Sequence, residues 1–311
     1  DGARRSAEAA PPLRARVLSA GERISTHLGA ALLAAWDLPA RWTDATQLLE
    51  SERAEGETDA NAYLEARVPV RSQPERAEAS VNGASLVLTQ GFIARNTEGE
   101  TCLLGRGGSD TSAALMAAML NAEFLEIWSD VHGIFTADPS RIPTARLIRH
   151  LGYREAQEMA ALGAKVLHPR CVGVAARAGV PLVLRSTDDP GREGTRVESA
   201  SEDHPVVTAV TCRRGVTLLS ISTLDMWEQP GYLARLFAPF EALGFSIDLL
   251  ATSESAVSLT LDAIPGGLDG RPFADLLTRL GRMGRVAHLR PPGGQAQVAR
   301  ERTGGAGGHG Q

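Results

Sequence analysis

Apolar residues recur at helical spacing near the start of the chain, where Leu13, Val17 and Ile24 belong to one stripe. A stripe that repeats every three to four residues is typical of an amphipathic helix, so we predict a helix over residues 13–38. Pro39 follows at once and cannot continue a helix.

Farther along, short apolar runs alternate with helical patterns as far as residue 185. The run Leu86–Ala94 is bounded by a turn at Asn96–Gly99, as expected of a buried strand. Thr111–Leu120 is almost wholly apolar and predicts a helix that is buried on most sides. The remaining predictions for this part are strands over 101–104, 123–129 and 180–185 and helices over 154–162 and 168–178.

The rhythm of the pattern changes near residue 200. The predicted order becomes strand, helix, two strands, helix, strand, which is the ferredoxin-like βαββαβ unit. We therefore expect one domain over 1–200, a second over 204–290, and a disordered tail over 291–311, where seven glycines accompany almost nothing apolar. The predicted elements of the second domain are strands over 206–222, 245–253, 256–263 and 285–289 and helices over 231–243 and 272–280.

Composition removes several classes of function. A net charge of -5 and an aromatic content of 5% do not predict a nucleic-acid surface. No apolar run approaches the ~18 residues that a membrane helix needs. The cysteines Cys102, Cys171 and Cys212 lie far apart, so their spacing indicates neither a metal site nor a disulfide framework, and we expect a reducing cytoplasm.

Only one of the 32 basic residues is a lysine, Lys165, which stands in Gly163–Pro169. An ammonium is a compact point charge, whereas the guanidinium of arginine is a flat fork of five donors. A lone lysine beside a glycine and apolar residues is therefore a candidate for phosphate contact. The alternative is a single codon that escaped a strong arginine bias.

A glycine turn, Gly105–Asp110, stands between a predicted strand and the apolar helix. Glycines there let backbone amides approach a ligand, and the start of a helix favours anions. Arg106 can hold a carboxylate through two parallel hydrogen bonds. The spacing is neither a Walker loop nor a dinucleotide fingerprint, and a plain structural turn with a surface arginine is the alternative.

Polar residues also follow the strand over 123–129, where α/β sheets bind ligands. Asp130 is a candidate for contact with a nucleotide sugar or base, and Phe135 for packing on adenine. An Asx turn and a core aromatic are the alternative for these two residues. The seven histidines include no HExxH pair, so the sequence does not predict a zinc site, and His168 is expected to cap a helix.

Together these motifs resemble aspartate kinase, of the amino-acid kinase superfamily. The resemblance covers about residues 15–290 and implies a three-layer αβα kinase sheet followed by an ACT regulatory domain. The chain also resembles those members of the family that are fused to diaminopimelate decarboxylase. The matching segments are Thr89–Ile93, Leu104–Asp110, Ile127–Val131, Gly133–Pro139, Glu158–Ala160, Gly163–Pro169 and Ile247–Glu254.

The resemblance also implies roles for residues in each segment. Asp110 and Lys165 would act in phosphoryl transfer. The cofactors would be ATP and Mg²⁺, and no metal site formed by protein ligands alone is expected. L-Aspartate would contact Glu22, Arg106, Gly107, Gly108 and Ser109. ATP would contact Ser129, Asp130, Phe135, Ser140, Arg141, Lys165 and Val166. A regulatory amino acid, with lysine favoured, would bind between ACT domains of a homodimer at Met226, Gly231, Tyr232, Leu233, Ser246, Asp248, Thr252, Ser253 and Glu254.

Three departures from the family pattern bear on activity. The amino-terminal Lys-Phe-Gly-Gly-Thr-Ser loop has no counterpart before Glu22, and no second ACT unit follows residue 290. Asp138-Pro139 is followed by Ser140, with Arg141 one place later than in the family. Since the chain also opens with Asp1, we expect a chain cut at both ends that does not turn over by itself.

Two other functions remain open from the sequence. One is a kinase for another carboxylate, such as N-acetylglutamate, against which the Arg106–Asp110 turn and the ACT-like unit both count. The other is a non-catalytic amino-acid sensor, which the missing phosphate loop favours. The complete enzyme would transfer the γ-phosphoryl group of MgATP to the side-chain carboxylate of aspartate.

Overall fold

The computed structural model describes residues 10–71, 79, 81–161, 166–199, 208–213, 216–223, 229–261, 264–289 and 295–299. The chain divides into two compact units. Unit 1 comprises Asp1–Thr211 with Val298–Gln311, and unit 2 comprises Cys212–Gln297. The predicted boundary near residue 200 stays a prediction, because residues 200–207 lie outside the described ones.

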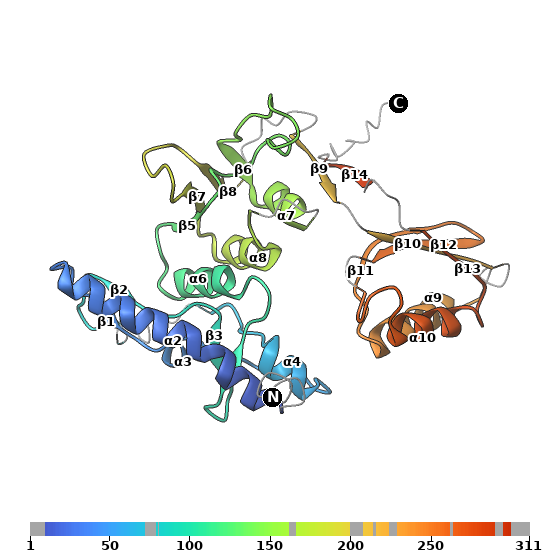
Figure 1. Cartoon of the computed structure of the whole chain (residues 1–311), viewed down its shortest axis with the longest axis horizontal. Helices are drawn as coiled ribbons and strands as arrows, with labels where there is room; N and C mark the ends of the chain where they lie inside the picture. The colour runs from blue at the N-terminus through green and yellow to red at the C-terminus, as the bar shows by residue number, and fades with distance from the viewer. Residues whose placement is uncertain are drawn as a thin grey trace, which may run out of the picture. The chain divides into compact units, whose positions relative to one another are not determined.

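Unit 1 mixes helices with short strands (Figure 1). It opens with a 25-residue helix, α2, close to the helix predicted over 13–38. Its elements are α2 (Pro11–Ala35), β1 (Arg41–Trp42), α3 (Ala45–Leu48), α4 (Asp59–Leu64), β2 (Val87–Leu88), β3 (Ile93–Arg95), β4 (Thr101–Leu103), α6 (Gly108–Met119), β5 (Leu125–Ser129), β6 (His150–Gly152), α7 (Tyr153–Ala161), α8 (Pro169–Ala178), β7 (Leu182–Ser186) and β8 (Thr195–Glu198), and β9 (Ala209–Arg213) begins in it.

A four-stranded sheet in the order β5-β7-β8-β6 organises the second half of this unit. β5 runs parallel to β7 and β6 parallel to β8, while β7 and β8 are antiparallel. The pairs β1–β2 and β3–β4 form separate small sheets among the described strands. The apolar faces of the helices and sheet meet in one core, which includes Leu104, Leu115, Ile134, Met159, Cys171, Val172, Leu182, Leu184 and Val197.

The prediction of one continuous strand over 86–94 is wrong. The structure has two strands there, β2 and β3, with a break between them at residues 89–92. Phe92 adopts a left-handed φ of 69°, and a Cβ at Gly91 would lie 3.0 Å from Ser109. The backbone therefore turns to pass close to the start of α6, which a run of apolar residues cannot indicate.

Unit 2 has the predicted ferredoxin-like topology, which the structure confirms. Its antiparallel sheet has the order β11-β12-β10-β13, and α9 and α10 pack on one face (Figure 1). Its core contains Leu219, Ile221, Leu236, Phe240, Val257, Leu259, Phe273 and Leu276. Its elements are β10 (Thr217–Ser222), α9 (Tyr232–Ala242), β11 (Ile247–Thr252), β12 (Ala256–Leu261), α10 (Arg271–Leu280) and β13 (Arg285–Leu289).

Two further predictions need correction near the ends of unit 2. The single strand predicted over 206–222 is two strands, β9 and β10, which belong to different sheets. Within the tail predicted as disordered, Gln295–Ala299 forms β14, which pairs with β9. Hydrogen bonds from a distant strand can order a polar segment, and composition carries no signal for such a partner.

No helix in the described part of the chain combines the length and the apolar character needed to cross a membrane. Cys102 and Cys171 are free and buried, and burial raises the pKa of the Cys171 thiol to about 12. The side chain of Cys212 lies outside the described residues.

The packing of Gly194 against Leu184 generates a test of the fold. A methyl group at Gly194 would overlap the carbonyl oxygen of Leu184, whereas a methyl group at Gly191 in the same loop would meet nothing within 4 Å. We expect Gly194→Ala to lower the free energy of unfolding by about 3 kcal/mol. Gly191→Ala should change it by less than about 1 kcal/mol. Urea denaturation of both variants measures this, and equal effects would contradict the packing described.

Candidate functional site

The glycine turn between β4 and α6 brings three parts of unit 1 together. Gly105 and Gly107 have φ values of 70° and 62°, which glycine adopts at little cost. A methyl group at Gly105 would overlap the carboxylate of Glu65, and one at Gly107 would overlap the ring of His168. The turn therefore lies directly against a side chain that follows α4 and one that begins α8.

His168 connects the two helix starts. Its Nδ1 accepts a hydrogen bond from the backbone N–H of Arg170 at 3.3 Å, so His168 caps α8 as predicted. Its own backbone N–H donates to the carboxylate of Asp110 in the first turn of α6. One residue thus anchors the beginning of α8 and restrains the acidic group of α6.

Burial favours the neutral forms of both Asp110 and His168. Partial burial raises the pKa of Asp110, although the charge and the backbone N–H of His168 act in the opposite direction. Burial also lowers the pKa of His168, helped by Arg170 and Arg106 and opposed by Asp110 and Glu65. A carboxyl group with a raised pKa beside basic groups is a common feature of functional sites.

Arg170 holds the end of β4 in place. Its guanidinium donates to the carbonyl of Leu104 at 2.6 Å and to that of Ala66 at 3.3 Å. Leu104 directly precedes the glycine turn, so the position of the turn depends on a side chain more than sixty residues away in the chain. Arg170 and Glu65 were not among the predicted site residues, because no local pattern marks contacts between distant segments.

Arg106 and Ser109 project outward from the same turn. Both residues are exposed, whereas Gly108 between them is buried. No hydrogen bond or ion pair joins the side chain of Arg106 to another described residue. An exposed guanidinium at the start of a helix is available to an anionic ligand, since the free amides there favour negative charge.

Glu22 lies apart from this cluster in its recorded contacts. It belongs to α2, where its backbone carbonyl accepts a hydrogen bond from Thr26 Oγ1 at 2.9 Å. Within the described residues, no hydrogen bond or ion pair connects Glu22 with Arg106. The structure thus brings together the predicted residues 106–110, but it records no direct contact between them and Glu22.

A second group of predicted residues follows β5. The backbone N–H of Thr187, after β7, donates to the carbonyl of Ser129 at 2.8 Å, so the carboxyl ends of these parallel strands meet. Asp130 is exposed just beyond this edge. Phe135 is half-buried and its backbone pairs with Leu147. The edge matches the usual position of ligands in α/β sheets.

Ser140 and Arg141 are engaged within their own turn. The carboxylate of Asp138 accepts hydrogen bonds from the backbone N–H of Ser140 at 3.0 Å and from its hydroxyl at 2.6 Å. Arg141 Nε lies 3.8 Å from the same carboxylate. Of the two residues predicted near the phosphates after α7, Val166 is partly buried against the core, and Lys165 lies outside the described residues.

The predicted effector residues of unit 2 fall into two groups. Gly231 precedes α9 with a φ of 75°, and Leu233 is 40% exposed. Tyr232 packs in the core, where its hydroxyl donates to the carbonyl of Met283 at 3.2 Å. The group on and after β11 is exposed and comprises Asp248, Thr252, Ser253 and Glu254, as is Ser246 just before the strand. Met226 lies outside the described residues.

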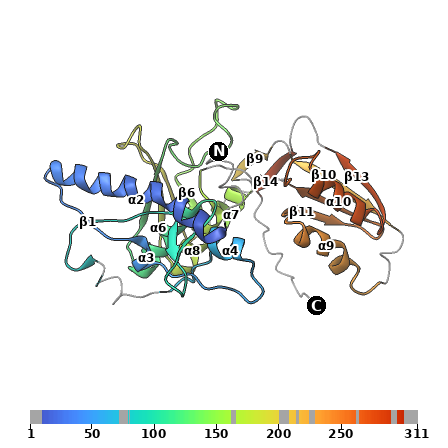
Figure 2. The same ribbon diagram turned by 60° about the horizontal axis from the view of Figure 1, so that its bottom comes forward.

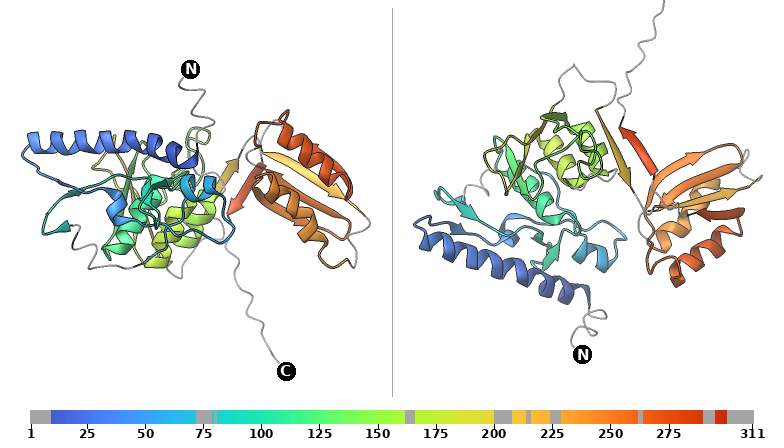
Figure 3. Two further views of the ribbon diagram at one scale, coloured as in Figure 1. Left: turned by 90° about the horizontal axis from the view of Figure 1, so that it is seen from below. Right: turned by 45° about the horizontal axis from the view of Figure 1, so that its top comes forward.

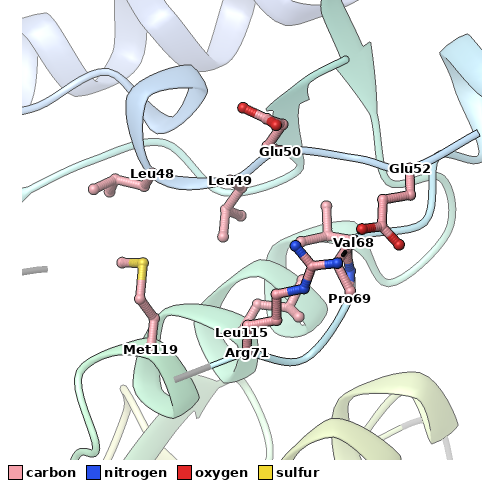
Figure 4. Close-up of a pocket in the computed structure, with 9 residues that line it drawn as sticks. All are labelled: Leu48, Leu49, Glu50, Glu52, Val68, Pro69, Arg71, Leu115 and Met119. Carbon is pink, nitrogen blue, oxygen red and sulfur yellow. Dashed lines mark hydrogen bonds and ion pairs between the residues drawn. The ribbon is translucent and has the colours of Figure 1, made fainter. Parts of the chain in front are cut away.

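A separate pocket opens beside the far end of α6 (Figure 4). Its cavity volume is about 50 Å³, and its lining contains none of the predicted site residues. Arg71 forms an ion pair with Glu52 at its rim. Its lining comprises Leu48, Leu49, Glu50, Glu52, Val68, Pro69, Arg71, Leu115 and Met119.

Comparisons with known proteins agree with this arrangement. Residues 3–186 match the amino acid kinase family. The chain is 40% identical over 256 residues to the lysine-sensitive aspartokinase 3 of Escherichia coli, covering 81% of this chain and 55% of that protein. It is 36% identical over 254 residues to the chloroplastic aspartokinase 3 of Arabidopsis thaliana, covering 80% and 45%. The chain spans about half the length of these curated relatives.

Solved structures support the same relationship. The E. coli aspartokinase III complex with lysine and aspartate gives a TM-score of 0.75 at 36% identity, covering 90% of this chain and 61% of that chain. The complex of that enzyme with aspartate and ADP gives a TM-score of 0.73 at 34% identity, covering 90% of this chain and 62% of that chain. The resemblance inferred from the motifs, and the α/β fold that it implied, are confirmed.

The burial of Asp110 generates a prediction about stability and pH. The pKa of Asp110 is raised in the folded state, so this carboxyl stabilises the fold most at pH values below its ordinary pKa of 3.8. The contribution is lost as the pH rises through the raised pKa. Asp110→Asn keeps an oxygen that can accept the bond from His168 but cannot ionise. We expect this variant to melt a few degrees higher than the parent chain at pH 7, with a difference that shrinks toward pH 4.

The control is Asp189→Asn, in an exposed loop of the same unit. It should melt like the parent chain throughout this range. A lower melting temperature for Asp110→Asn at pH 7 would mean that the carboxylate contributes more through its hydrogen bond than burial costs.

Proposed function

The chain belongs to the amino acid kinase family, and we propose that it carries the substrate and nucleotide contacts of an aspartate kinase. The observation that carries the proposal is the half-buried Asp110 beside the exposed Arg106 at the start of α6. Two relatives named as aspartokinases, and solved aspartokinase complexes with aspartate and with ADP, support this substrate pair.

In the proposed reaction, an oxygen of the aspartate side-chain carboxylate attacks the γ-phosphorus of ATP. The bond from that phosphorus to the oxygen bridging to the β-phosphate breaks, ADP leaves, and an acyl phosphate forms. The protein forms no covalent intermediate in this scheme. Its contribution is to position two anionic partners and to offset their charge.

Arg106 and the start of α6 would hold aspartate. The exposed guanidinium of Arg106 can take a carboxylate through two parallel bonds, and the backbone N–H of Ser109 at the start of α6 adds a further donor. The N–H of Gly108 is already bonded to the carbonyl of Gly105. Ser109 is also exposed, and its hydroxyl lies beside Gly91. His168 and Arg170 act through the turn, since they fix its backbone and do not belong to the predicted substrate contacts.

The edge after β5 would hold the nucleotide. Ser129 and Asp130 stand where a ribose can meet polar groups, and Phe135 supplies an apolar surface of moderate exposure. Lys165 and Val166 are assigned to ATP by the family resemblance alone. Ser140 and Arg141, bonded to Asp138, would border this site rather than reach into it.

Mg²⁺ would neutralise charge on the transferring phosphates. It usually keeps several waters and takes one or two carboxylates together with phosphate oxygens. No cluster of three or more potential protein ligands occurs within the described residues, and such a cluster is not required by this mode of binding. Asp110 is the carboxylate that the glycine turn offers for it.

Unit 2 would sense an amino acid as an ACT domain. Its ferredoxin-like topology and the exposed Asp248–Glu254 segment support this role. The relative named as lysine-sensitive, and its complex with lysine, favour lysine as the effector. We propose that the binding site assembles between two copies of unit 2.

A kinase for another carboxylate and a non-catalytic sensor are the competing functions. Calorimetry separates them, because each function predicts binding of a different molecule. We expect aspartate to bind in the presence of MgADP and N-acetylglutamate to give no heat. Preference for N-acetylglutamate would support the other kinase, and binding of the effector alone would support the sensor. Trapping acyl phosphate with hydroxylamine then tests turnover.

Arg106→Lys should weaken aspartate binding about ten-fold or more and leave ADP binding within about two-fold. The reason is that an ammonium cannot reproduce a bidentate bond to a carboxylate, and a charged hydrogen bond contributes roughly 1.5–3 kcal/mol. Arg154→Lys, at an exposed position of α7, is the matched control and should bind both ligands like the parent chain. Equal losses of aspartate and ADP affinity would make Arg106 a structural residue.

Lysine should raise the melting temperature of the chain, since a ligand that binds only the folded state stabilises it. Asp248→Ala should abolish the shift, because the carboxylate would hold the ligand's ammonium group. Asp275→Ala, on the exposed face of α10, should keep it. A shift with threonine and none with lysine would identify a different effector. No shift with any amino acid would refute the effector site.

A further inference from the structure

The segment that carries the predicted nucleotide contacts after β5, residues 129–135, is anchored at both of its ends. It is green in Figures 2 and 3, and we call it the nucleotide edge. At its start, the carbonyl of Ser129 accepts hydrogen bonds from the backbone N–H of Thr187 at 2.8 Å and from the hydroxyl of Thr187 at 3.1 Å. Asp130 follows this first anchor directly, and Phe135 belongs to the second.

Phe135 is the centre of a short antiparallel ladder, in which it pairs with Leu147. On one side of this pair, the backbone N–H of Ile148 donates to the carbonyl of Ile134 at 2.8 Å. A regular ladder would add the reverse bond, from the N–H of Ile134 to the carbonyl of Ile148. In the described part of the chain, the hydroxyl of Thr195 replaces that bond. It accepts from the N–H of Ile134 at 2.8 Å and donates to the carbonyl of Ile148 at 2.7 Å.

The other side of the Phe135 pair departs from a regular ladder in the same way. The N–H of Thr136 donates to the carbonyl of Arg146 at 2.9 Å. The N–H of Arg146 donates in return to Thr136 Oγ1, at 3.0 Å, and the carbonyl of Thr136 accepts from the N–H of Val210 at 2.9 Å. Threonine hydroxyls thus take part in the ladder on both sides of Phe135, so the path of the backbone depends on them.

The space around Thr195 admits little change. Thr195 is the first residue of β8, is 0% exposed, and pairs with Leu184 of β7. A Cβ at Gly133, where φ is 141°, would lie 2.5 Å from Thr195 Oγ1, and a Cβ at Gly194 would overlap the carbonyl oxygen of Leu184. The backbone of the nucleotide edge therefore passes directly against the hydroxyl. The donor of this hydroxyl and one of its acceptor positions are used within unit 1.

We propose that Thr195 is a positioning residue for nucleotide binding, an inference that rests on the function proposed above. Its hydroxyl fixes the spacing between the backbones of Ile134 and Ile148, and so directs the segment from Asp130 to Phe135 along the carboxyl end of β5. Thr195 does not reach the nucleotide itself, because its side chain is fully buried. Removal of the hydroxyl would leave a buried N–H and a buried carbonyl without their partner, which favours a shift of the segment.

Calorimetry of Thr195 variants with MgADP, and with aspartate at saturating MgADP, tests this role. Thr195→Val keeps the branched shape and removes both hydrogen bonds, so we expect MgADP affinity to fall about ten-fold or more. Thr195→Ser keeps the hydroxyl and should bind MgADP within about three-fold of the parent chain. Thr195→Cys, with a weaker donor and acceptor, should lie between the two. Aspartate affinity should stay within about two-fold in all three, because the glycine turn has separate contacts.

Ser51→Ala is the matched control for the loss of a buried hydroxyl. Ser51 belongs to the same unit and is 4% exposed, and its Oγ lies 3.3 Å from the sulfur of Cys102. It has no contact with the ladder around Phe135 in the described part of the chain. We expect this variant to bind MgADP and aspartate like the parent chain, even where it melts at a lower temperature.

Amide hydrogen exchange measures the position of the segment without any ligand. In Thr195→Val, the N–H of Ile134 loses its acceptor and should exchange at least about ten-fold faster than in the parent chain. Peptides that cover residues 105–110 should exchange as in the parent chain, and Thr195→Ser should restore the slow exchange of Ile134. Unchanged exchange of Ile134 in Thr195→Val would show that the hydroxyl does not hold the segment, and would overturn the proposal.

The binding data separate a failure of this assignment from a failure of the proposed function. A parent chain that binds MgADP, with a Thr195→Val variant that binds it equally tightly, would overturn the role of Thr195 alone. Equal losses of MgADP and aspartate affinity in Thr195→Val would make Thr195 a general structural residue. A parent chain that gives no heat with MgADP would refute the nucleotide role of the edge itself, and the role of Thr195 with it.

Discussion

The arrangement of the candidate site depends on one contact, in which the start of α8 lies on the start of α6. His168 caps α8, packs its ring against Gly107, and donates its backbone N–H to Asp110. No side chain at position 107 leaves room for that ring, so the glycine and the histidine are a matched pair. Arg170 extends the same contact to the end of β4. The starts of α6 and α8 are thereby held together at one place in the unit.

The sequence was sufficient for those parts of the fold in which one face of an element meets water and the other a core. The helix over 13–38, the apolar helix after the glycine turn and the whole βαββαβ unit follow from such patterns. It was insufficient where a distant segment decides the outcome. The break at Phe92, the separation of β9 from β10, and the pairing of β14 all depend on partners that lie far away in the chain.

The candidate site divides in the same way. Residues 106–110 and His168 could be found because glycines, an arginine and a helix cap leave local marks, and the structure gathers them. Glu65 and Arg170 could not, since an acid and an arginine occur everywhere in this chain. Tyr232 shows another limit of the motif, which does not indicate that this side chain is buried and that its hydroxyl donates to the backbone carbonyl of Met283. The roles predicted for Lys165 and Met226 stay predictions, since both residues lie outside the described ones.

The opposed pKa shifts of Asp110 and His168 have a consequence for the energetics of any anion that approaches the turn. Burial already holds the acid toward its protonated form and the base toward its neutral form. Additional negative charge would raise both pKa values, so each group would gain proton occupancy. The affinity of the turn for an anion is thereby coupled to the protonation of Asp110 and His168, whereas a cation beside Asp110 would lower the pKa of that carboxyl.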